Sequence, residues 1–338
     1  MAGIKRFVAL ILLVAMAWLS GCQTKVYEPI DSKTSLIIVV NYLEKSLSFY
    51  DEETRKEITR WEMPFPFTGA RLLPDNKTLL VYGKELNGIY LYDLESGKQA
   101  GKWKLGKGIA NAVLSSDRSK VYLASHEEDA ILVMSLDGNQ TAEIAVGNDP
   151  LTMVESKRGD ELYVLNFHGS TISVVDLAAY RLKKTLPAKQ GSTGAVLIEP
   201  LGELWTGGHG AGNYVESKVT VYSIDTGEIM GEIDAPVMPV DMEQEGRFVF
   251  VISHGSNQLR KIDVHTKRVE ASIEIGSNPF DISIYNHLLY CVSYDSDELF
   301  IVQPDELKVM DTLQTGKGPF QVLFRKGAEH ESAKSVDH

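Results

Sequence analysis

Short hydrophobic segments alternate with polar turns along most of the chain, and the stretch 146–187 shows this pattern as one complete unit. It opens with a Gly-x-x-Pro turn at 147–150. Four strand-like segments follow the turn, at 151–154, 162–165, 172–175 and 181–186. Four short strands in about 40 residues, separated by turn signals, are typical of one blade of a β-propeller.

The opening turn of this unit recurs along the chain at intervals of roughly 40–46 residues, which is the length of a four-stranded blade. Its seven copies are 64–67, 106–109, 147–150, 191–194, 236–239, 276–279 and 316–319. The hydrophobic strand that follows each later polar turn keeps the same phase, at 36–40, 79–82, 121–124, 162–165, 204–206, 248–252 and 288–292. The pattern predicts an all-β fold, a seven-bladed propeller of four-stranded antiparallel blades over residues 35–325.

A third repeated feature is an aspartate that closes a strand. The six copies are Asp51, Asp93, Asp137, Asp176, Asp225 and Asp263. Aspartate at such a position accepts backbone hydrogen bonds in a tight turn. We therefore interpret these carboxylates as structural.

The two ends of the repeat region complement each other. Three strands, at 36–40, 47–50 and 58–63, precede the first turn, and one strand, at 320–324, follows the last. Together they make one blade. We predict that the C-terminal strand lies innermost beside the N-terminal strands and closes the ring, which removes open sheet edges.

Several of these segments resemble the YVTN family of β-propeller repeats. The sequence Tyr-Val-Leu-Asn at 163–166 is closest to the motif that names the family, and Val-Val-Asp at 174–176 and Gly-Ser-Asn-Pro at 276–279 match its flanks. The resemblance covers about residues 35–325. It implies the propeller architecture and leaves the activity open, because the same blades carry many functions.

The first 22 residues have the features of a secretory signal. Lys5 and Arg6 precede a compact apolar run, and small residues close it. The ending Leu-Ser-Gly-Cys at 19–22 resembles a bacterial lipobox, which implies that Cys22 is acylated and becomes the first residue of the mature chain. We expect a signal peptide at 1–21, a polar tether at 22–34 and a disordered polar tail at 326–338. The protein would be lipid-anchored at the extracytoplasmic face of the membrane.

Charge and cysteine content narrow the classes of partner. The formal charge is −12, and it becomes −14 once Lys5 and Arg6 leave with the signal. Such an acidic protein is a poor partner for nucleic acid or anionic lipid. The second cysteine, Cys291, lies in a strand-like run and is predicted to be a small buried core residue.

The residue just past each second strand is the strongest candidate for function. In a propeller these positions form a ring at one end of the central channel. The candidates are Tyr42, Lys84, His126, Phe167, His209, His254 and Tyr294, together with His168 beside Phe167. Each of them is aromatic, an imidazole or cationic.

Three interpretations of this ring remain open. The side chains cap the channel and bond neighbouring loops, or they bind a protein, peptide or glycan through stacking and hydrogen bonds. In the second case they would be partly exposed. The third interpretation is a metal- or redox-dependent site, for which the ligands would be His126, His168, His209 and His254.

The sequence shows no catalytic motif. It contains no Gly-x-Ser-x-Gly nucleophile elbow, and the Gly-rich segment 207–212 follows no strand-to-helix pattern, so we interpret 207–218 as the largest loop at this end of the channel. The function expected from the sequence is a non-enzymatic, membrane-anchored binding or scaffold propeller. No cofactor is expected for that function, and a metal ion belongs only to the alternative.

Overall fold

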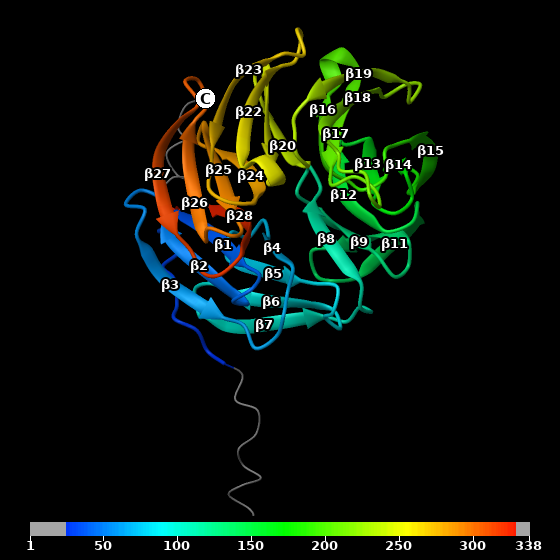
Figure 1. Cartoon of the computed structure of the whole chain (residues 1–338). Coiled ribbons are helices and arrows are strands. Elements are labelled where there is room, and N and C mark those ends of the chain that lie inside the picture. Colours follow the sequence, from blue (N-terminus) through cyan, green and yellow to red (C-terminus); the bar gives the residue numbers. More distant parts are fainter. Residues whose placement is uncertain (1–24, 329–338) are drawn as a thin grey trace, which may run out of the picture.

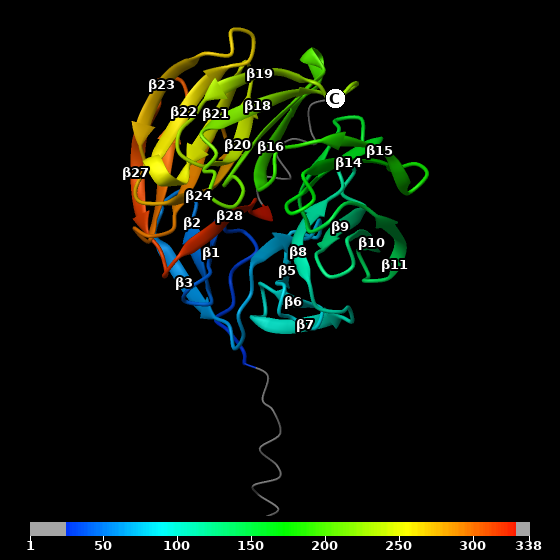
Figure 2. The same cartoon turned by 45° about the vertical axis from the view of Figure 1, so that its right-hand side comes forward.

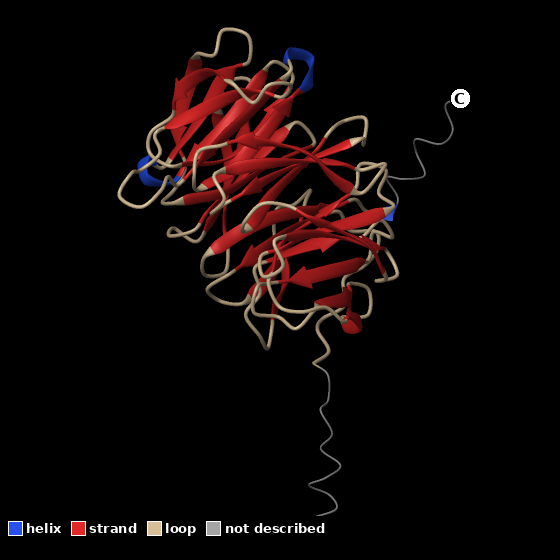
Figure 3. Cartoon of the chain, turned by 90° about the vertical axis from the view of Figure 1, so that its right-hand side faces the viewer, coloured by secondary structure: helices blue, strands red, loops and turns tan. Residues whose placement is uncertain are grey.

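The computed structural model describes residues 25–328 and shows 28 strands arranged as seven four-stranded antiparallel sheets around a central channel (Figure 1). Two short 3-10 turns, η1 (Glu199–Leu201) and η2 (His254–Ser256), lie between strands. Nearly all of the rest is strand or short loop (Figure 3). The seven-bladed propeller predicted from the repeats is confirmed.

The first four blades are built as follows. Blade 1 contains β28 (Pro319–Arg325), β1 (Leu36–Asn41), β2 (Ser46–Asp51) and β3 (Glu57–Glu62). Blade 2 contains β4 (Gly69–Leu72), β5 (Thr78–Tyr82), β6 (Ile89–Asp93) and β7 (Lys98–Trp103). Blade 3 contains β8 (Ile109–Leu114), β9 (Lys120–Ser125), β10 (Ala130–Ser135) and β11 (Gln140–Ala145). Blade 4 contains β12 (Pro150–Glu155), β13 (Glu161–Asn166), β14 (Thr171–Asp176) and β15 (Arg181–Pro187).

The other three blades follow the same order. Blade 5 contains β16 (Ser192–Ile198), β17 (Glu203–Gly208), β18 (Lys218–Ser223) and β19 (Ile229–Asp234). Blade 6 contains β20 (Pro239–Glu245), β21 (Phe248–Ser253), β22 (Gln258–Asp263) and β23 (Val269–Glu274). Blade 7 contains β24 (Pro279–Tyr285), β25 (Leu288–Ser293), β26 (Glu298–Gln303) and β27 (Lys308–Gln314).

The hydrophobic pattern follows from each strand's place in its blade. Second strands such as β1 and β9 are almost wholly buried, because neighbouring blades cover both of their faces. Outermost strands such as β11 and β23 are mostly exposed. Five of the seven predicted turns end on the first residue of an innermost strand, as at Pro150 of β12 and Pro279 of β24. The turn predicted at 64–67 ends just before β4, and the one predicted at 191–194 is misplaced, because 192–194 already belong to β16. The repeat in the sequence therefore determines the number of blades and which strand of each blade lies toward the channel.

The C-terminal strand closes the ring, as predicted. In Figure 2, β28 lies beside β1, and the two strands pair antiparallel from Leu36 opposite Arg325 to Val40 opposite Gln321. The buried Arg325 guanidinium also donates to the carbonyl oxygens of Asp31 and Thr34. Residues about 290 apart in sequence are thus joined in one blade.

A ring of hydrogen bonds links each innermost strand to the next one. In every case a side chain on one strand bonds the backbone of the following blade. The seven links are Arg71 Nε to Ala112 O, Asn111 Nδ2 to Leu151 O, Thr152 Oγ1 to Thr193 O, Thr193 Oγ1 to Val240 O, Ile282 N to Asp241 Oδ2, Val322 N to Asp281 Oδ2 and Ala70 N to Gln321 Oε1. These bonds satisfy polar groups that face the channel and fix the blades against one another.

Both ends of the described chain are packed more closely than predicted. Residues 25–34 are not a free tether, because Tyr27 stacks on Trp61 with ring centroids 4.8 Å apart and Ile30 is buried. Residues 326–328 are held too, since Ala328 N donates to Ser32 O. The proposed signal peptide, Cys22 and residues 329–338 lie outside the described residues. Within 25–328, no helix is long and apolar enough to span a bilayer.

The smaller sequence predictions can also be compared with the structure. Cys291 is fully buried in β25 with a free thiol, as predicted. Four of the six strand-closing aspartates, Asp51, Asp93, Asp176 and Asp263, accept backbone N–H groups in the turns that follow them. Their structural role is confirmed.

Candidate functional site

One end of the channel, here called the mouth, gathers the predicted ring. It is formed by the turns that enter the innermost strands and by the loops that leave the second strands. Tyr42 directly follows β1, His126 follows β9 and His209 follows β17, and the other predicted residues take the equivalent places in their blades. The sequence therefore located this ring correctly, whereas its role in binding stays a prediction.

A cavity of about 750 Å³ opens below the mouth. This volume lies in the range of small-molecule sites. Five of the eight predicted residues line it, namely Lys84, His126, Phe167, His168 and His209. Tyr42, His254 and Tyr294 do not line the cavity themselves, but their rings contact Phe280 or Phe320 of its lining.

Asp149 is the centre of a charged cluster on one side of the cavity, and sequence reasoning missed it. Its side chain is only 3% exposed. His126 Nδ1 lies 2.5 Å from Asp149 Oδ1, and His168 Nδ1 lies 2.7 Å from Oδ2. The Lys84 ammonium lies 3.5 Å from Oδ1. Three side chains from three blades thus converge on one buried carboxylate.

This arrangement fixes the tautomers of the two imidazoles. An ionised carboxylate only accepts hydrogen bonds, so both His126 and His168 must carry a proton on Nδ1. The Nε2 atom of each ring is then left for another partner. Both rings retain substantial exposure, with 40% and 55% of their side-chain surface accessible.

The opposite side of the mouth is a continuous arc of rings. Adjacent centroids are 5.1 Å apart for His209 and His254, 4.6 Å for His254 and Phe280, and 4.1 Å for Phe280 and Phe320. Tyr42 continues the arc from Phe320 at 5.6 Å. These separations are typical of aromatic pairs that stabilise each other, and the tilted rings form an aromatic wall.

Phe280 and Phe320 reach the mouth through a repeated backbone device. Six of the seven innermost strands contain a β-bulge at their second residue. The bulged residues are Ala110, Leu151, Thr193, Val240, Phe280 and Phe320, and all six line the cavity. A bulge redirects its side chain, which here means into the channel. For five of these residues the sequence signal was the position directly after a predicted turn, whereas Thr193 lies inside its predicted turn.

His254 of the predicted ring is less accessible than a binding face requires, whereas His209 is half-buried and lines the cavity. His254 is only 7% exposed, and burial, with a smaller contribution from His209, lowers its pKa to about 3. Burial also lowers the pKa of His209. Both rings are therefore neutral, and the expectation of partial exposure is wrong for His254. It acts as a packed support for the aromatic arc.

The four histidines considered as metal ligands do not come together. His126 and His168 are bound to Asp149, whereas His209 and His254 pack in the arc beyond Phe167. In the described part of the chain, no group of three or more His, Cys, Asp or Glu residues could hold a metal ion. The Lys84 ammonium beside Asp149 would also oppose a cation.

Deeper in the channel, three carboxylates share the wall of blades 6 and 7. Burial, and then the charge of Asp281, raise the pKa of Asp241 well above its usual value and that of Glu243 to about 7. Burial raises the pKa of Asp281 to about 6. The Arg71 guanidinium acts in the opposite direction on Glu243 and Asp281. Burial therefore makes the charged form of each of these acids less favourable than it is in water.

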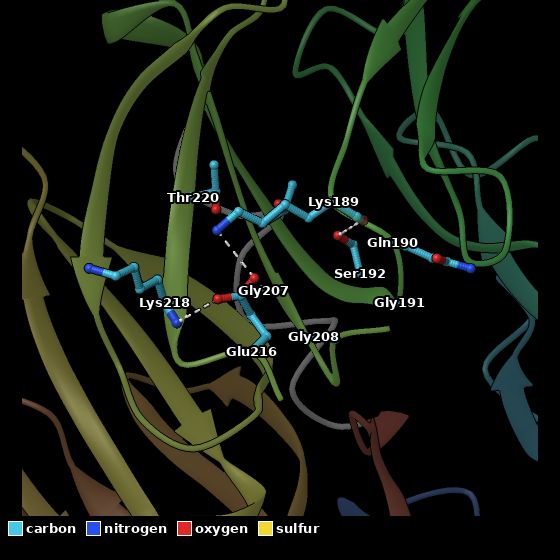
Figure 4. A pocket seen from close by; sticks show the side chains of 11 residues that line it. Lys189, Gln190, Gly191, Ser192, Gly207, Gly208, Glu216, Lys218 and Thr220 are labelled. Atoms are coloured by element: carbon cyan, nitrogen blue, oxygen red, sulfur yellow. Dashed lines mark hydrogen bonds and ion pairs between the residues drawn. The ribbon is translucent and has the colours of Figure 1, made fainter. Parts of the chain in front are cut away.

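The Gly-rich segment forms the longest loop of the mouth face, as predicted, between β17 and β18. A small pocket beside it contains an ion pair between Lys189 Nζ and Glu216 Oε2 at 3.2 Å (Figure 4). Lys189 Nζ also pairs with Glu232 Oε1 at 2.8 Å. The backbone N–H of Lys218 also donates to Glu216. The charged groups of this pocket are therefore paired with other groups of the protein, and we interpret the pocket as structural.

The fold is a β-propeller with a cavity at one end of its central channel. The chain belongs to the YNCE-like beta-propeller family, whose model matches residues 19–290. The serine-threonine kinase receptor-associated protein of Gallus gallus is 30% identical over 96 residues, which are 28% of this chain and 27% of that protein. This chain thus matches about a quarter of that curated relative.

Solved structures of several proteins share the fold. Kuenenia stuttgartiensis hydrazine synthase has a TM-score of 0.71 at 14% identity, with 86% of this chain and 99% of that chain covered. The dihydro-heme d1 dehydrogenase NirN, in complex with DHE, has a TM-score of 0.64 at 12% identity, with 90% and 78% covered. At these identities the likeness shows the fold alone, and the named functions differ.

Proposed function

We propose that this protein is a non-enzymatic binding protein that holds its ligand at the mouth of the channel. The ligand is a peptide, a glycan or a segment of a partner protein narrow enough to enter the cavity. The alternative of a metal- or redox-dependent site finds no support in the geometry of the histidines.

The observation that carries this proposal is the composition of the mouth cavity. Its volume of about 750 Å³ combines an apolar aromatic wall with polar groups fixed in position by the buried Asp149. Cavities of this size with few, well-placed polar groups are typical of binding sites. His126 and His168 keep their outer nitrogens free, a feature that a ring used only to cap the channel does not need.

Site-specific photo-cross-linking tests the binding function. A photoreactive phenylalanine analogue replaces Tyr42, which is 41% exposed at the mouth, and in a matched variant it replaces the exposed Arg158 on the opposite face. We expect a cross-linked molecule from the Tyr42 position only. Its binding to the purified protein should weaken about ten-fold or more in His168→Ala. Equal adducts at both positions, or none at Tyr42, would refute binding at the mouth.

We further propose that the protein is held at the extracytoplasmic side of the membrane through lipid on Cys22. Acyl chains bind a membrane by burying CH₂ groups, each worth about 0.8 kcal/mol. Cys22→Ser cannot accept the lipid, so we expect it to move from the membrane fraction to the soluble fraction while the propeller stays folded. Detergent partitioning and the mass of the purified protein measure this. A variant that still fractionates with membranes contradicts the anchor.

A further inference from the structure

The two sides of the mouth differ in chemistry. Blades 2, 3 and 4 contribute the charged cluster around Asp149, and blades 5, 6, 7 and 1 contribute the aromatic arc. We propose that the mouth recognises a ligand in which a flat aromatic group is joined to an anionic group, either a carboxylate or a phosphate. This inference rests on the proposed binding function and assigns the class of ligand.

The charged side presents donors to the cavity. Asp149 is almost fully buried, and its two oxygens are taken by His126, His168 and Lys84. The carboxylate therefore has little capacity left for a ligand. The groups that remain available are the Lys84 ammonium, which is 41% exposed, and the outer nitrogens of the two imidazoles. An anion is the ligand group that all three can bind together.

The two imidazoles can take part in this anion site. A doubly protonated imidazole donates from both nitrogens, so such a ring can hold Asp149 through Nδ1 and an anion through Nε2. Asp149 keeps both rings oriented for this purpose.

The other titratable groups around the cluster do not reverse this preference. Asp129 is already engaged, because its Oδ1 accepts the backbone N–H of Asp149. Glu127 is exposed in the same loop as His126, and His209 is neutral through burial. Asp241 and Asp281 lie on the opposite wall, where each accepts a backbone N–H from the next blade.

The aromatic arc accounts for the other part of the ligand. Phe280 and Phe320 both line the cavity, with their rings 4.1 Å apart at an angle of 35°. Phe167 lies between the arc and His168, with its centroid 4.8 Å from that ring. A planar group that stacks on Phe280 or Phe320 can thus extend an anionic substituent toward Lys84.

Fluorine NMR with small probes tests the ligand class. The probes are para-fluorobenzoate, its neutral amide and para-fluorobenzylamine, and the N-acetyl-para-fluorophenylalanine acid and amide represent a peptide end. We expect the acids to bind, and the amides and the amine to bind about ten-fold more weakly or not at all. Preference for benzoate points to a free small molecule, and preference for the phenylalanine acid points to a peptide carboxyl terminus.

Matched variants locate the binding. Lys84→Ala and Phe280→Leu should each weaken benzoate binding about ten-fold. His287→Ala removes the exposed histidine paired with Glu245 on the opposite face and should leave benzoate binding unchanged.

The outcomes separate this inference from the binding function. Equal binding of acid, amide and amine, or binding that Lys84→Ala does not change, overturns the anionic class. If cross-linking at Tyr42 succeeds but none of the acids binds, the ligand class is wrong and the binding function stands. If both experiments fail, both proposals are wrong.

Discussion

Deleting residues 316–338 should abolish the stable fold. This truncation removes β28, the innermost strand of blade 1. It exposes the inner edge of β1 and removes the packing of β28 against β24 and β4. It also removes the buried Val322, Leu323 and Arg325. We expect a loss of more than about 5 kcal/mol in the free energy of unfolding, which is of the order of the whole stability of a typical domain. Aggregation in size-exclusion chromatography and dye binding to exposed apolar surface would report it.

Two further variants make this prediction specific. Leu323→Ala keeps the strand and should cost about 2–4 kcal/mol, because it leaves a cavity in a buried cluster. Deleting only residues 329–338, beyond the last described contact at Ala328, should leave the melting temperature nearly unchanged. Closure by β28 is contradicted if the long and the short truncation are equally stable.

Glu243→Gln should stabilise the protein at high pH and not at low pH. The folded-state pKa of Glu243 is raised to about 7, mainly because burial disfavours the charged form. Between about pH 4.5 and pH 7 the native state therefore binds more protons than the unfolded state, so stability falls as the pH rises through this window. At pH 8 the neutral glutamine avoids the buried charge. We expect a gain of about 1–3 kcal/mol at pH 8 and almost none at pH 4.5.

Urea-induced unfolding at the two pH values measures this effect. The matched control is Glu274→Gln at the exposed end of β23, which should change stability little at either pH. Asp281 titrates in the same window, with a pKa raised to about 6, so part of the loss with rising pH should persist in the Glu243 variant. A gain of equal size at both pH values would show that Glu243 is not a buried acid of this kind.

The architecture could be predicted because its determinants are local and repeated. A turn such as 276–279 specifies the entry to an innermost strand, and the continuous apolar run of Leu36–Asn41 specifies a second strand covered on both faces. Even ring closure follows from counting, since three strands precede the first turn and one follows the last. The ring of residues after the second strands has the same periodic origin.

The chemistry of the mouth could be predicted only in part, because it depends on contacts between blades. Asp149 lies in a turn that resembles the other six, and its convergence with His126 and His168 appears only when blades 2 to 4 are side by side. Its backbone φ of 56° is in the left-handed region, which aspartate tolerates better than most residues. It is the only acidic residue in the seven turns, and that was the available signal.

The docking of residues 25–30 bears on how the propeller would stand on a membrane. This segment lies at the outer edge of the disc, where Lys25 contacts Glu62 at the end of β3 and Tyr27 N donates to Gly97 O beside β7 (Figure 1). Only Gln23 and Thr24 separate Cys22 from Lys25, a span of at most about 11 Å. If Cys22 carries a lipid as proposed, this short span would keep the rim of the propeller near β3 and β7 close to the membrane surface.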